Sequence, residues 1–140
     1  MASIHKDIRA ALESHLNNTA NLPTIAYENV SFTPVVGTAF LKSQYVPTST
    51  KPAVRGLNPQ LRYQGIYSIT VFAPEGAGPN EAEGYINNII DSFAATTDIT
   101  FTNGDGDTFK VSIDYSERQQ GMIDSPWYFT PINIGWYIYN

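Results

Sequence analysis

The sequence has no cysteine, few charged residues and no long apolar run. Without cysteine there is no disulfide framework, no thiol nucleophile and no thiolate metal site. Eight Lys and Arg face thirteen Asp and Glu, giving a formal net charge of -5, which argues against a protein that grips nucleic acid by neutralising phosphates. No apolar stretch has the length of a membrane span, and residues 1–6 lack the apolar core of a signal peptide. We therefore expect a cytoplasmic protein that does not enter a membrane.

The composition is that of a folded chain. Hydrophobic residues make up 42% of the 140 residues, which suits one compact domain spanning residues 1–140. Nine tyrosines are present, and aromatic residues reach 13%. Exposed tyrosine favours protein interfaces, because the ring supplies contact area while the hydroxyl tolerates water. Half-buried strand positions are the competing explanation for any single tyrosine.

Apolar periodicity predicts two amphipathic helices. Ile4, Ile8, Leu12 and Leu16 recur at four-residue steps and predict a helix over residues 4–17. A second apolar stripe, which ends at Phe93, predicts a helix over residues 80–94.

Alternation and turn residues predict the strands. The expected strands are 24–29, 38–46, 62–73, 99–102 and 108–113, with one or two more in 127–139. Residues 47–61 and 114–126 are expected to be long polar loops, because proline and glycine interrupt any pattern there. This order predicts an α+β fold in which two helices pack on one face of a mostly antiparallel sheet.

Motifs that carry chemistry are weak. Residues 103–107, Asn-Gly-Asp-Gly-Asp, are similar to a calcium-binding loop, but they lack the spaced bidentate acid and are also what a tight turn requires. His5 and His15 lie ten positions apart on one helix, too far for a shared metal. Glu81 with Glu83 suits helix-end electrostatics better than an acid/base pair. We predict no enzyme, no cofactor and no metal.

Longer runs resemble a known family. The segments are Phe32-Thr-Pro-Val-Val-Gly-Thr-Ala-Phe-Leu, Tyr45-Val-Pro, Arg62-Tyr-Gln-Gly-Ile-Tyr-Ser-Ile-Thr-Val-Phe-Ala-Pro74 and Gly76-Ala-Gly before a helix. They resemble the tail terminator proteins of long-tailed bacteriophages. The resemblance implies a virion tail protein, assembled in the host cytoplasm, that forms a ring, by analogy a hexamer. It also implies that the ring caps the tail tube protein, ends tube growth and joins a head completion or connector protein.

Two sets of residues are candidates for the contacts of such a ring. The candidate subunit or partner contacts are Tyr45, Lys51, Arg55 and Arg62. The candidate acidic wall of the lumen is Asp105, Asp107, Glu117 and Asp124. A neutral or acidic wall is expected because genome DNA must pass without specific binding, and a basic wall would hold it. A head-tail connector subunit, a calcium-dependent binding module and a small hydrolase remain as alternatives.

Overall fold

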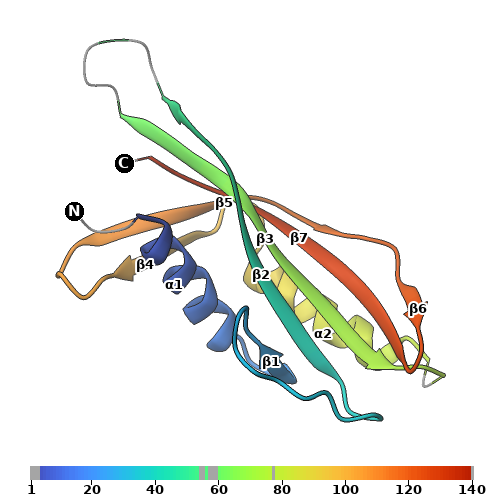
Figure 1. Ribbon diagram of the computed structural model, residues 1–140. Coiled ribbons are helices and arrows are strands. Elements are labelled where there is room, and N and C mark those ends of the chain that lie inside the picture. Colours follow the sequence, from blue (N-terminus) through green and yellow to red (C-terminus); the bar gives the residue numbers. More distant parts are fainter. Residues whose placement is uncertain (1–3, 54–55, 57–59, 77, 140) are drawn as a thin grey trace.

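The computed structural model describes residues 4–53, 56, 60–76 and 78–139 (Figure 1). Its elements in chain order are α1 (Ile4–Asn17), β1 (Thr24–Ala26), β2 (Phe40–Pro52), β3 (Leu61–Pro74), α2 (Asn80–Ser92), β4 (Asp98–Thr102), β5 (Thr108–Arg118), β6 (Met122–Asp124) and β7 (Trp127–Tyr139). No helix in the described part of the chain is long and apolar enough to cross a membrane.

Both predicted helices are confirmed. Helix α1 has the predicted bounds, and Ile8, Leu12 and Leu16 of its apolar stripe are fully buried. Helix α2 ends two residues earlier than predicted, at Ser92, where the backbone N–H of Phe93 donates to the Ile89 carbonyl. Each buried aliphatic side chain in these stripes contributes about 1.5–3 kcal/mol, which fixes the helices on the sheet.

The predicted fold class is wrong. Of the described residues, 48% are in strands and 21% in helices, and the seven strands found there form one mixed sheet. Along the sheet the order is β1-β2-β3-β7-β5-β4, with β6 pairing β7, and β1 runs parallel to β2. The sheet curls into a half-barrel, so the expected α+β layers, with two helices on one face of a mostly antiparallel sheet, do not describe it (Figure 1).

Two glycines and two bulges explain the curl. Gly65 in β3 pairs with Trp136 in β7, and the indole of Trp136 covers it on the inner side. Gly135, which directly precedes Trp136 in β7, is covered by the ring of Tyr115. Bulges follow Pro47 in β2 and precede Tyr115 in β5. Bulges and aromatic-covered glycines bend strands, so the breaker residues that argued for loops instead shape continuous strands.

Most of the two predicted loops is also strand. β2 continues to Pro52 and β3 begins at Leu61, so residues 47–52 and 61 of the predicted loop 47–61 are strand, and residues 54–55 and 57–59 lie outside the described residues. β5 continues to Arg118 and is followed by β6, within the predicted loop 114–126. These stretches are polar and largely exposed, so they lack the alternation of a half-buried strand that sequence patterns detect.

One core lies inside the curl. Alternate residues of β2, β3, β5 and β7 meet the apolar stripes of both helices, with Tyr67, Ile69 and Trp136 among the largest buried side chains. Helix α1 is tied to strands far apart in the sheet order. The Tyr45 hydroxyl of β2 lies 2.8 Å from His5 Nδ1, and Asn103, just after β4, donates to Asp7 over 3.0 Å.

Candidate assembly surfaces

The hairpin of β2 and β3 projects beyond the rest of the molecule (Figure 1). We call its outer part, residues 47–52 and 61–64, the arm. Lys51 and Arg62 are register partners on the arm, and Arg62 pairs on its other side with Tyr139 of β7. The Arg62 guanidinium lies 4.7 Å from the ring centroid of Tyr137 and 5.9 Å from that of Tyr139. These four side chains form the cation–tyrosine patch.

The patch concentrates positive charge. Lys51 is exposed and Arg62 is half-buried, and neither forms an ion pair with another described residue. The Nε atom of Arg62 is buried without a hydrogen-bond partner among the described residues. Asp114 lines the same hollow of about 140 Å³ as Arg62 but makes no ion pair with it. Lys51 and Arg62 are like charges directly opposite each other in the sheet, and such pairs are destabilising.

The other two candidate contact residues do not extend this patch. Tyr45 lies in the core, with 7% of its surface exposed, and its ring stacks on Trp136 at a centroid distance of 5.3 Å. Burial raises the pKa of the Tyr45 hydroxyl. Arg55 lies outside the described residues. Of the four candidates, the structure therefore brings together Lys51 and Arg62.

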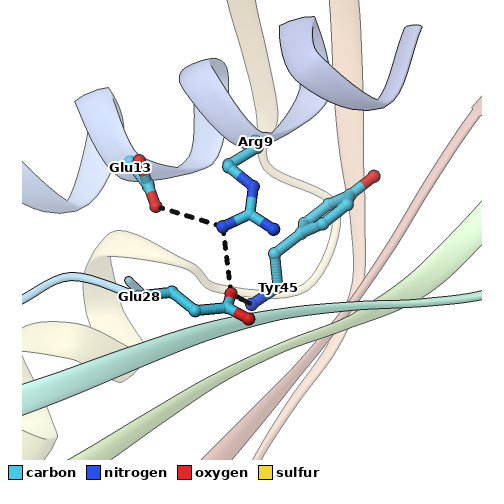
Figure 2. A network of polar contacts seen from close by, with 4 residues as sticks. All are labelled: Arg9, Glu13, Glu28 and Tyr45. Atoms are coloured by element: carbon cyan, nitrogen blue, oxygen red, sulfur yellow. Dashed lines mark hydrogen bonds and ion pairs between the residues drawn. The ribbon is translucent and has the colours of Figure 1, made fainter. Parts of the chain in front are cut away.

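Tyr45 is instead the centre of a polar network beneath helix α1 (Figure 2). β1 ends at Ala26, and Glu28 Oε1 then accepts from the Tyr45 backbone N–H and from Arg9 Nη1, each over 3.0 Å. The Tyr45 N–H bond, followed by the Arg9 guanidinium, lowers the pKa of Glu28. Glu13 lies 4.0 Å from Arg9, yet burial raises the pKa of Glu13 despite that positive charge. The network anchors the start of the segment that joins β1 and β2.

Asp105 and Asp107 lie on the turn between β4 and β5. The Oδ1 atom of Asn103 accepts the backbone amides of Asp105 at 3.0 Å and Asp107 at 2.9 Å. Asn103 thus closes the turn. Both aspartates are exposed and form no ion pair with a described residue, and Lys6 lines the hollow beside Asp105 without reaching it.

Glu117 and Asp124 lie elsewhere. Glu117 is near the end of β5 and Asp124 ends β6, which Figure 1 places at the far side from the β4–β5 turn. Asp105 and Asp107 therefore lie together, whereas Glu117 and Asp124 are separate, because their register partners on β7 are Asn133 and Trp127.

The end of the molecule away from the arm is apolar. It consists of the segment between β1 and β2 together with β6, and the register from Phe40 through Phe72 and Phe129 to Met122 places both at the same end of the sheet. Val36 exposes 72% of its surface and Ile123 exposes 66%, which is unusual for aliphatic residues. We call this surface the apolar end, and its members are Val30, Phe32, Val35, Val36, Met122 and Ile123.

Aromatic rings support the apolar end from beneath. Phe40 of β2 stacks on Phe72 of β3 at 4.5 Å and contacts the indole of Trp127 at 5.1 Å. Phe32 packs on Phe40 at 5.1 Å, which joins the segment to the sheet. A cavity of about 490 Å³ opens beside these rings, with Lys42 at its wall. This surface was not predicted, although three valines and Phe32 between residues 30 and 36 break strand alternation and are a detectable signal.

The polar groups that suggested an enzyme have structural partners. His15 Nε2 lies 2.8 Å from the Ser92 carbonyl oxygen and 3.1 Å from Ser92 Oγ. A bond to the carbonyl needs the proton on Nε2, so this nitrogen cannot accept the Ser92 proton as a base would. Arg118 donates to Glu83 over 2.8 Å and lowers the pKa of that carboxyl. Within the described part of the chain, no three His, Asp or Glu residues are grouped to hold a metal.

Comparisons with known proteins support an assembly role. The family model described as "Phage tail terminator protein" matches residues 7–136. No curated protein matches the chain significantly. One solved structure, whose name states no function, is 23% identical, covers 96% of this chain and 94% of its own, and superposes with a TM-score of 0.69. That likeness shows a shared fold.

Proposed function

Because the chain belongs to the phage tail terminator family, we propose that it caps the tail tube as a ring, ends tube polymerisation and joins the tail to the head. The family match makes the chain a structural component of a phage tail. The ring, by analogy a hexamer, would contact the tail tube protein on one side and a head completion or connector protein on the other. It would assemble in the host cytoplasm and act without a cofactor.

The observation that carries this proposal is the chemical difference between the two ends of the folded molecule, the arm and the apolar end. Tube subunits that add head to tail form an open filament unless a cap presents a far side that recruits no further ring. The apolar end exposes aliphatic side chains of the kind buried at protein contacts, whereas the arm is polar and cationic. We assign the apolar end to the tube, because the arm offers the next tube ring no matching surface.

The lumen is the second part of the proposal. An inner wall that DNA passes should be neutral or acidic. Of the candidate acids, we assign to the wall Glu117 and Asp124, which lie on β5 and β6, the two strands that pair with β7 on the side away from β3. Tight, salt-sensitive binding of the purified protein to duplex DNA in a gel-shift assay would contradict an acidic lumen.

Deleting the gene tests the cap directly. We expect the mutant phage to make tails of abnormal and variable length beside filled, tailless heads, because tube growth is unchecked. Purified protein added early should restore uniform length in extracts. Free tails of normal length in the mutant lysate would show that another protein stops the tube. That result would support the connector alternative, in which this chain acts on the head side of the junction.

A further inference from the structure

The charges of this chain are segregated along the sequence. Residues 29–74 contain none of the thirteen Asp and Glu, yet they contain four of the eight Lys and Arg. This acid-free segment forms the β2–β3 hairpin with the segment that precedes it. All the acids, with the other four cations, lie in the rest of the chain. A second copy of the chain therefore offers the hairpin the opposite charge that the hairpin itself lacks.

The cation–tyrosine patch is where this imbalance is strongest. Lys51 and Arg62 face each other directly across two strands, and Arg62 also lies over two tyrosine rings. Register partners share one side of the sheet, so both cations point the same way. Their repulsion is not relieved by an ion pair among the described residues. Two cations and two tyrosine hydroxyls form a surface suited to binding carboxylates.

We propose that the cation–tyrosine patch of one copy binds Asp105 and Asp107 of a second copy. This contact deepens the proposed ring and rests on it. The two aspartates are exposed, lie two residues apart on a turn held by Asn103, and match a pair of cations in number and sign.

The two surfaces lie at the same end of the sheet, because Ser112 of β5 pairs with Tyr137 and β5 begins beyond that level, at Thr108. The patch lies on β2, β3 and β7, and the acidic turn lies beyond β7 in the sheet order, at the end of the edge strand β4. They are separate surfaces, so one copy can use both at once with different neighbours. A contact between unlike surfaces is head-to-tail, and such contacts close into rings when the rotation permits.

Duplex DNA is the competing occupant of a surface with cations and aromatic rings. The described patch holds two cations, whereas proteins that hold DNA by its phosphates neutralise many more charges. The net charge of -5 also opposes the approach of DNA. Both facts favour carboxylates of a second copy.

The contact is tested by reversing the charge of each surface in a separate variant and then mixing the two variants. Self-association of the full chain is measured by sedimentation velocity at low and at high salt. We expect salt to weaken it, and we expect Lys51→Glu, or Asp105→Lys with Asp107→Lys, to weaken it about tenfold or more. Mixing the two variants should restore association, because a reversed patch then meets a reversed turn. The controls are Lys42→Glu for the patch variant and Asp91→Lys with Asp124→Lys for the turn variant, since they make the same charge changes at exposed residues outside the two surfaces.

Several outcomes would overturn the contact. These are no self-association of the wild type at roughly millimolar concentration, equal weakening by Lys51→Glu and Lys42→Glu, or a mixture no stronger than its parts. Duplex DNA binding that Lys51→Glu abolishes and Lys42→Glu preserves would assign the patch to nucleic acid. Tail length in the gene-deletion phage is scored separately. If that phage makes tails of variable length but the mixed variants do not associate, the proposed contact is wrong and the tail-capping function still stands.

Discussion

The arm and the apolar end differ in every property that decides what a surface binds. β2 joins them, since it starts at Phe40 beneath the apolar end and finishes at Pro52 on the arm. That is roughly 40 Å of extended chain. The arm is polar and cationic and contains no acid, whereas the apolar end exposes aliphatic side chains over an aromatic base. We expect a cap to bind the tube with one end, here the apolar end, while its other end recruits no further tube ring.

Breaking the junction between the two ends should have the largest effect. Gly65 lies where the arm meets the body, and a methyl group there would sit 2.5 Å from the Val46 carbonyl oxygen and 2.7 Å from the Trp136 ring. The backbone oxygen cannot move without opening the hairpin, so Gly65→Ala should lower the free energy of unfolding by about 3 kcal/mol. Denaturant titration measures this.

The control for that substitution is Gly84→Ala. Gly84 is an exposed position within α2, with open space where the methyl group would lie. Alanine is the better helix former, so the free energy of unfolding should rise by about 0.5–1 kcal/mol. Equal effects of the two substitutions would show that Gly65 has no special role in the bend.

Hydrogen exchange should show that the two halves of β2 and β3 differ in local stability. Thr48 and Thr50 on the arm are exposed, whereas Tyr67 and Ile69 in the middle of β3 are buried. Amides in the arm should exchange at least about tenfold faster in the dilute protein, because less apolar surface opposes their opening. Assembly should slow them. Equal protection throughout both strands would remove the distinction between arm and body.

The apolar end can be altered without unfolding the chain. Val36→Asp should change the free energy of unfolding by less than about 0.5 kcal/mol, because Val36 is 72% exposed. In phage carrying this variant, tails should lengthen and the titre should fall about tenfold, because a charge would enter the tube contact. Val46→Asp, at an exposed valine of β2 outside the apolar end, is the control. If both variants gave uniform tails, the tube would contact another surface.

The sequence predicted the elements better than their arrangement. The stripe of α1 and the central strand β3 have strong apolar periods and were found nearly as predicted. The curl was missed because Gly65 and Gly135 act through contacts with rings distant in the chain, which no local pattern contains. Lys51 and Arg62 were predicted as contact residues and share one surface. Tyr45 lies in the core on the same side of β2 as Leu41 and Ser43, and the bulge after Pro47 turns Lys51 to the opposite side.

The smallest expected effect concerns how the apolar end is attached, through two carboxylates near Arg9 (Figure 2). The pKa of Glu28 is lowered in the folded chain, so its contribution to stability is present above its unfolded pKa and is lost as the pH falls through the folded pKa. Glu28→Gln should therefore lower the free energy of unfolding at neutral pH by less than about 1 kcal/mol, and the deficit should shrink in acid. The pKa of Glu13 is raised, so its ionisation opposes folding. Glu13→Gln should be neutral or slightly stabilising at neutral pH. Denaturant titrations across the acid range compare the two, and deficits of equal size would show that Glu28 does not anchor the segment leading to the apolar end.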